Sequence, residues 1–82
     1  MSLRAAFMFV APEADPQIHR AIVQTPEVDV TTVAVRDYAE AERMAVALAD
    51  EGMVALELCA GFGAEGLARV KKAVAGRIPV GA

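Results

Sequence analysis

Apolar residues along the chain fall into short blocks that alternate with stretches of helical periodicity. Residues 5–10, AAFMFV, form a continuous apolar run, which is typical of a strand covered on both faces. Residues 28–35, VDVTTVAV, are rich in β-branched side chains and predict a second strand, and residues 53–59, MVALELC, predict a third. Residues 78–80, IPV, begin a short fourth strand, and its proline suits the edge of a sheet.

The stretch between the first two strands predicts a helix. Asp15 is a good N-cap residue, and Pro16 suits the first helical position. An inward stripe of Ile18, Ala21 and Ile22 follows, and the sequence Thr25-Pro26 ends the helix.

Two further helices are predicted after the second and third strands. Asp37, with Glu40 three residues later, forms a capping box for the first of them, and Gly52 marks its end. The last helix runs from about Ala64 and stops at Gly76. The stripes expected to face the sheet are Ala41, Met44, Ala45 and Leu48 in one helix, and Leu67, Val70 and Val74 in the other.

This order predicts an α/β fold of β-α-β-α-β-α-β type, in which a small parallel sheet carries packed helices and ends in a short C-terminal edge strand. We expect residues 1–82 to form a single domain. Residues 1–3 are compatible with a cloning remnant, and the fourth strand is expected to be truncated.

Composition suggests self-association. Hydrophobic residues make up 56% of the chain, more than a lone 82-residue globule can easily hide. We therefore expect helices on both faces of the sheet and, in addition, a homo-oligomer that covers further apolar surface. A net charge of −3 argues against nucleic-acid binding, and no apolar stretch is long enough for a membrane span. With one cysteine and no clear signal peptide, a cytoplasmic location is expected.

The carboxyl ends of the predicted parallel strands form the expected working end, because ligands bind there in open α/β sheets. Gly61, Gly63 and Gly66 spell G-x-G-x-x-G at this end. The motif follows the third strand, and no acidic residue lies about 20 residues further on, so a dinucleotide site is rejected. The glycines either serve only the turn or open the helix N-terminus to a phosphate or carboxylate. Phe62 closes over a ligand, folds back onto the sheet, or enters a neighbouring subunit.

At this loop the chain resembles a family of small bacterial proteins of unknown function. The segments ELCAGFG and HRAIVQTPEV carry the resemblance most specifically, and it extends over nearly the whole chain. The family has glycine where this chain has Ala60, and its last strand continues past Ala82. The resemblance implies the fold and an interest in the loop, and it implies no activity.

Several other residues are candidates for chemistry. Cys59 is either an activated thiol at a helix N-terminus or a buried apolar residue, and His19 could face it across a crevice if the first and third strands are neighbours. Glu57 lies within a strand and needs a partner if that strand is central; at an edge it is merely solvated. The other candidates at the carboxyl ends of the predicted strands are Glu13, Arg36 and Glu65. No metal-ligand spacing is present, and no cofactor is expected.

Two functional hypotheses remain open. The first is a small-molecule site that binds an anion around residues 59–66, with candidate ligand-binding residues Gly61, Phe62, Gly63, Glu65, Arg36 and Glu13 and candidate catalytic residues Cys59, Glu57 and His19. The second is a non-catalytic homo-oligomeric or subunit-interaction module. No catalytic signature decides whether the protein is an enzyme.

Overall fold

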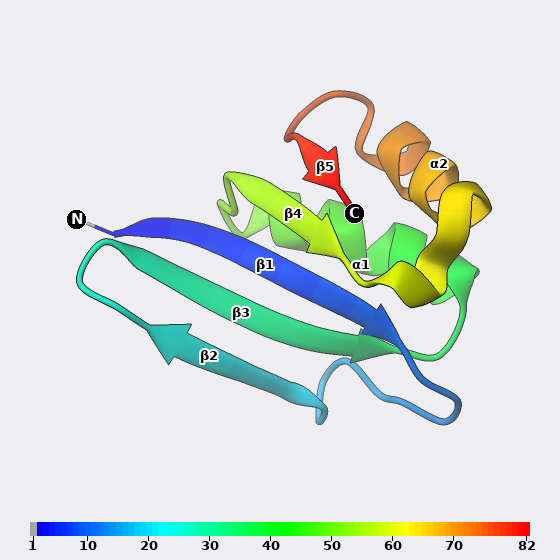
Figure 1. Cartoon of the computed structure of the whole chain (residues 1–82), viewed down its shortest axis with the longest axis horizontal. Coiled ribbons are helices and arrows are strands. Elements are labelled where there is room, and N and C mark those ends of the chain that lie inside the picture. The colour runs from blue at the N-terminus through cyan, green and yellow to red at the C-terminus, as the bar shows by residue number, and fades with distance from the viewer. Residues whose placement is uncertain (1) are drawn as a thin grey trace.

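The computed structural model describes residues 2–82 and contains a five-stranded sheet with two α-helices (Figure 1). The strands lie in the order β2-β3-β1-β4-β5. Their bounds are Leu3–Val10 for β1, Arg20–Gln24 for β2, Val28–Val35 for β3, Ala55–Leu58 for β4 and Val80–Gly81 for β5. The helices are α1, Tyr38–Asp50, and α2, Gly63–Val74, which a short 3₁₀ helix, Ala60–Phe62, precedes.

The sheet is mixed, so the predicted β-α-β-α-β-α-β order with an all-parallel sheet is wrong. β1 pairs in parallel with both β3 and β4, and β4 pairs in parallel with β5. β2 pairs antiparallel with β3, and no third α-helix exists within residues 2–82. The short edge strand β5 does lie at the end of the sheet, as expected.

The predicted first helix is a single turn followed by strand β2. Asp15 does cap a turn: its Oδ1 accepts from the Gln17 amide at 2.9 Å, and its carbonyl accepts from the His19 amide at 2.7 Å. The chain then extends, because Ile22 and Val23 are β-branched and because pairing with β3 satisfies backbone groups that would otherwise form a free edge. Thr25, predicted to end a helix, instead closes the hairpin to β3, with its hydroxyl donating to the Val28 carbonyl at 2.5 Å.

The other two helices form as predicted. Asp37 caps α1 by accepting the Glu40 amide at 2.8 Å, while the Glu40 carboxylate accepts from the Arg36 amide at 2.9 Å. α2 ends at Ala75, which adopts the left-handed conformation, and Gly76 follows with a φ of 78°. The predicted apolar stripe of α1 is buried, and so are Val70 and Val74 of α2.

Both helices cover the same side of the sheet. The crossovers from β3 to β4 and from β4 to β5 step across the sheet in the same direction, so right-handed connections bring α1 and α2 to one face. Figure 1 shows α1 behind the strands and no helix in front of them. The expectation of helices on both faces is therefore wrong. The core between helices and sheet is built from Ala6, Met8, Val33, Val35, Ala41, Met44, Ala45, Leu48, Met53, Leu56, Leu58, Phe62, Val70 and Val74.

We call the side of the sheet without helices the open face. The strand register assigns twelve residues of strands β1 to β4 to it: Leu3, Ala5, Phe7 and Phe9 of β1, Val28, Val30, Thr32 and Ala34 of β3, Ala21 and Val23 of β2, and Ala55 and Glu57 of β4. Of these residues only Thr32 and Glu57 are polar. Neither helix within residues 2–82 is long and apolar enough to cross a membrane.

Candidate functional site

The carboxyl ends of β1, β3 and β4 meet at one edge of the sheet, as the sequence predicts for parallel neighbours. The Ala11 amide donates to the Val35 carbonyl at 2.8 Å, and the Cys59 amide donates to the Met8 carbonyl at 3.0 Å. This pairing brings the turn that contains Glu13, the residue Arg36 and the loop after β4 to the same edge. Arg36 is partly neutralised there, because its guanidinium lies 3.5 Å from Glu40.

The three glycines of the loop differ in why the structure needs a residue without a side chain at each position. Gly63 has a φ of 64° and a ψ of −175°, a conformation that is almost restricted to glycine, and a Cβ atom there would meet no atom within 4 Å. Gly66 is buried, and an added Cβ would lie 2.9 Å from both the Phe62 and the Tyr38 rings. Gly61 is exposed, and its Cβ would lie 3.4 Å from the Cys59 sulfur. The turn and the helix packing thus account for two of the three glycines.

Phe62 folds back into the core. It is completely buried and stacks on Tyr38 with ring centroids 6.0 Å apart, and the Tyr38 hydroxyl donates to the Phe62 carbonyl at 2.7 Å. Arg69 lies over the Tyr38 ring at 5.4 Å and forms two hydrogen bonds with Glu42, of 3.0 and 3.1 Å. Of the three predicted roles for Phe62, the structure favours the one in which the side chain folds back into the protein. The contacts with Tyr38 also fix the loop against α1.

His19 and Cys59 do not meet across a crevice. β1 and β4 are neighbours, but His19 immediately precedes β2, and β3 and β1 both lie between it and Cys59. Three strand spacings separate them by about 14 Å. Cys59 is half-buried and packs against the core. Within residues 2–82, no three side chains among His, Cys, Asp and Glu come close enough together to hold a metal ion.

Glu57 lies in a strand with neighbours on both sides, yet it is exposed, because it projects from the open face. The structure gives its carboxylate no hydrogen bond or ion pair with any of residues 2–82. The space beside it exists because Gly81 has no side chain: an added Cβ at Gly81 would lie 3.4 Å from Glu57 Oε1. Leu56 and Leu58, the neighbours of Glu57 in the strand, are buried and face the helices.

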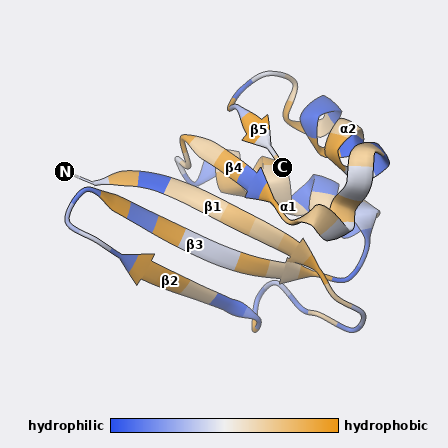
Figure 2. Ribbon diagram, viewed as in Figure 1, coloured by the Kyte–Doolittle hydropathy of each residue, from blue (hydrophilic) through white to orange (hydrophobic). Residues whose placement is uncertain are grey.

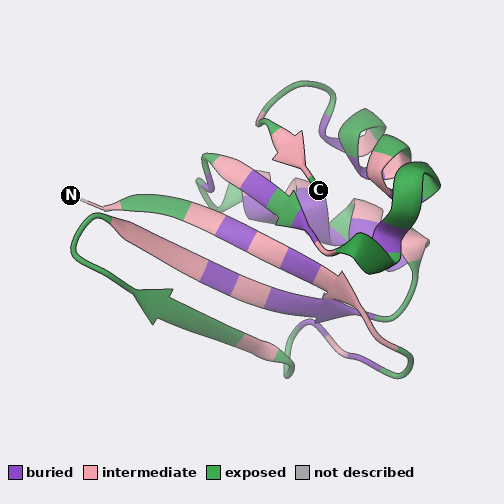
Figure 3. Cartoon of the chain, in the orientation of Figure 1, coloured by how far each residue is buried: buried purple, intermediate pink, exposed green. Residues whose placement is uncertain are grey.

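The open face is the feature that sequence reasoning missed, because a third helix was expected to cover it. Figure 2 shows that β1 and β3 are largely apolar, and Figure 3 shows half-buried residues alternating with buried ones along β1. Leu3 and Val23 are 60% and 62% exposed. The signal was available: the odd-numbered positions of β1 are apolar as well as the even-numbered ones, which predicts a strand covered on both sides.

A cavity of about 280 Å³ indents one margin of the open face, between Phe9, His19, Arg20, Ala21 and Thr32. The His19 ring is fixed by the turn, since its Nδ1 accepts from the Asp15 amide at 2.9 Å. In the neutral imidazole the proton is therefore on Nε2, which remains a donor. The structure gives neither Nε2 nor the Thr32 hydroxyl a hydrogen-bond partner among residues 2–82.

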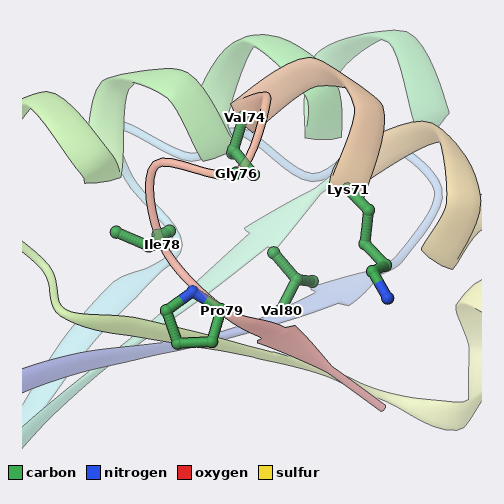
Figure 4. Close-up of a pocket in the computed structure, with 6 residues that line it drawn as sticks. All are labelled: Lys71, Val74, Gly76, Ile78, Pro79 and Val80. Carbon is green, nitrogen blue, oxygen red and sulfur yellow. The ribbon is translucent and has the colours of Figure 1, made fainter.

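Two other cavities lie away from the loop of residues 59–66. One, of about 500 Å³, is lined by Lys71, Val74, Gly76, Ile78, Pro79 and Val80, between the end of α2 and the β5 edge (Figure 4). The other, of about 370 Å³, is a polar groove between α1 and residues 15–20, across which Arg20 and Glu51 form an ion pair of 2.6 Å. The glycine loop lines none of these three cavities.

The family model of a family of unknown function, DUF6506, matches residues 3–82. The chain therefore belongs to this family, which confirms the resemblance to a family of unknown function. No curated protein and no solved structure matches the chain.

Proposed function

We propose that this member of the DUF6506 family is a self-associating module whose open face packs against the open face of a second copy. The observation that carries the proposal is the composition of that face: ten of the twelve positions defined above are apolar, all of these except the buried Ala34 are at least partly exposed, and no helix within residues 2–82 covers them. A contiguous apolar patch of this kind on a soluble domain marks an interaction surface.

The size of the open face suits a weak but specific dimer. Its strands have 8, 5, 8, 4 and 2 residues. At about 3.3 Å per residue and about 4.8 Å between strands, they make roughly 400 Å² of flat sheet per copy, and the corrugated surface is larger. Two copies therefore bury at least roughly 800 Å², which is close to the roughly 1,000 Å² that specific interfaces need and belongs to the small, weak interfaces.

Two neighbouring residues of β2 provide a matched test. Val23 and Ile22 are 62% and 57% exposed, but Val23 pairs with Val30 on the open face, whereas Ile22 pairs with Thr31 on the other side. We expect Val23→Glu to raise the dimer dissociation constant at least tenfold, since it buries an unpaired charge, and Ile22→Glu to leave it nearly unchanged. Sedimentation equilibrium across the micromolar range measures both variants. A wild-type chain that stays monomeric, or equal effects of the two variants, would contradict the proposal.

A second function, anion binding at the start of α2, is favoured by one specific observation. Phe62 occupies the N-cap position and makes no side-chain hydrogen bond to the helix, and Gly63 beside it borders open space. The Gly63 amide already donates to the Ala60 carbonyl, but the next amides of this 12-residue helix have no side-chain cap and are suited to a phosphate or a carboxylate. Glu65 in the first turn opposes this, because its carboxylate already complements the helix dipole.

Gly76 offers the control for the anion hypothesis. Both Gly63 and Gly76 have positive φ, and a Cβ at either would meet nothing within 4 Å, so valine strains both positions without a clash. We expect phosphate to shift the amide resonances of Ala64 and Glu65 in the wild type and in Gly76→Val, and to leave them unshifted in Gly63→Val. Wild-type resonances that do not respond to phosphate would end this hypothesis.

A further inference from the structure

The geometry points to one arrangement of the two open faces: the two-fold axis runs along the strands, and Glu57 of each copy binds His19 of the other. The inference rests on the proposed self-association and adds which strands face each other. It follows from two groups at opposite margins of this face that have no partner among residues 2–82, the Glu57 carboxylate and the His19 imidazole N–H.

Facing sheets keep their strand directions within about 30° of each other, so two symmetric arrangements are available. In the first, the axis lies along the strands, and the inferred arrangement has it between β1 and β3, the position that brings Glu57 over β2. It then places β1 of one copy over β3 of the other, and β4 over β2, because the strand order is β2-β3-β1-β4-β5. In the second, the axis crosses the strands, and each strand lies over its own copy.

The two arrangements differ in which residues of the second copy lie opposite Glu57. Glu57 pairs with Phe7, close to the middle of β1, so an axis across the strands there brings the two carboxylates together on an apolar surface. Two like charges without partners are costly to bury. The axis along the strands instead places each Glu57 over the second copy's β2, at the level of Ala21, which shares a register with Thr32 and Phe7.

His19 provides the matching donor. It precedes Ala21 by two residues and is one of the residues that line the cavity on the open face. The Asp15 amide fixes Nδ1 as the acceptor, so Nε2–H is free to donate to a carboxylate. With facing sheets about 10 Å apart and an offset of about two residues along the strand, the two side chains together span the gap. Each dimer would contain this hydrogen bond twice.

Thr32 and Phe9 complete the pairing site. Both line the same cavity as His19, and neither the Thr32 hydroxyl nor His19 Nε2 has a partner among the residues that the structure describes. In the dimer the carboxylate of Glu57 enters this cavity from the second copy, where the hydroxyl is a second donor. The site is therefore formed by residues of both copies, and one copy alone leaves it incomplete.

Crosslinking distinguishes the two arrangements. Cys59 is the only cysteine, so Cys59→Ser gives a thiol-free parent chain. Single variants Ala21→Cys and Ala55→Cys are made in it and treated with a bismaleimide of about 10 Å. With the axis along the strands, β2 of one copy lies over β4 of the other, while the two β2 strands are about 14 Å apart sideways. We expect a covalent dimer only when the two variants are mixed.

A double-mutant cycle tests the pair itself. His19→Asn keeps an acceptor for the Asp15 amide but loses the Nε2 donor, and Glu57→Ala removes the carboxylate that accepts from this donor. Each should weaken the dimer about tenfold, and the double variant should be no weaker than either one, because both remove the same bond. Glu27 is an exposed residue outside the strands, so Glu27→Gln is the control and should leave the dissociation constant of the dimer unchanged.

The outcomes separate this inference from the proposed function. Crosslinking of Ala21→Cys with itself, or additive effects in the cycle, would overturn the arrangement while leaving the dimer. A thiol-free parent that sediments as a monomer at micromolar concentration would overturn the proposed function together with the arrangement. A dimer that gives no crosslink in any mixture would place the interface elsewhere and overturn both.

Discussion

Gly66 shows how one residue can be required by packing when local propensity would favour another. It lies in the first turns of α2, where alanine would be the better helix former. A Cβ atom there would lie 2.9 Å from the Tyr38 and Phe62 rings, closer than real contacts allow. The third glycine of the loop motif thus allows the close contact between α1 and α2, and it needs no ligand to explain it.

We therefore expect Gly66→Ala to lower the free energy of unfolding by about 1–3 kcal/mol, despite the gain in helix propensity. Gly61→Ala is the matched control. Its φ is not positive, and its Cβ would make ordinary contact with Cys59, so the change should stay within about 0.5 kcal/mol. Urea unfolding measures both variants. A Gly66→Ala protein as stable as the wild type would mean that α1 and α2 can separate at no cost.

The contact between α1 and α2 also carries an ion pair with a defined pH dependence. The hydrogen bond from Arg69 is the largest reason why the pKa of Glu42 lies below its usual range, and burial opposes it. A carboxyl whose folded pKa is lowered stabilises the fold above its unfolded pKa, and this contribution is lost as the pH falls through the folded pKa. Both side chains are partly exposed, 40% for Arg69 and 33% for Glu42, so solvent screens the pair and the contribution is small.

We expect the melting temperature of Glu42→Gln to lie slightly below that of the wild type at pH 7. The difference should close as the pH falls through the lowered pKa of Glu42, where the wild-type carboxyl takes up its proton. High salt should also reduce it, because exposed pairs are screened. A difference that persists unchanged at pH 2 would mean that Glu42 contributes through packing of its side chain and not through its charge.

At the scale of whole elements, the sequence predicted the features that local chemistry controls. α1 and α2 have their caps and stripes in the chain itself, so both could be located from Asp37, Glu40 and the spacing of the apolar residues. β2 could not be located this way. The helix-start signal before it, Asp15-Pro16, produces a real turn, but the extended conformation of residues 20–24 is decided by a distant partner, the free edge of β3.

The same error determined how much of the candidate site could be predicted. Because a helix was assigned to residues 16–24, this helix was expected to cover the apolar side chains on the second face of β1. No open face was therefore expected. The carboxyl edge was predicted correctly, because parallel strands bring their ends together whatever lies beyond them. The distance between His19 and Cys59 was not predicted correctly, because it depends on the strand order. Strand order in turn depends on the direction of the crossovers, and no single residue encodes that direction.

For the whole molecule, the driving force of association should have the signature of apolar burial. The open face has one charged residue among twelve, and a pair of faces buries roughly 800 Å² of mostly apolar surface. Such burial gives a negative change in heat capacity, and at about 0.45 cal/mol/K per Å² it amounts to about −0.4 kcal/mol/K per dimer. Sodium chloride should leave the dissociation constant nearly unchanged, while sulfate should lower it.

Dilution calorimetry at several temperatures measures this heat capacity directly. Val23→Glu is the control, because a chain that no longer dimerises should give no heat of dissociation at the same concentrations. The Glu57–His19 bonds contribute little to the heat capacity, so the expected value follows from the apolar face alone and does not depend on which arrangement the copies adopt. A heat capacity change near zero, combined with a dimer that dissociates in high salt, would mean that charged groups outside the open face hold the two copies together.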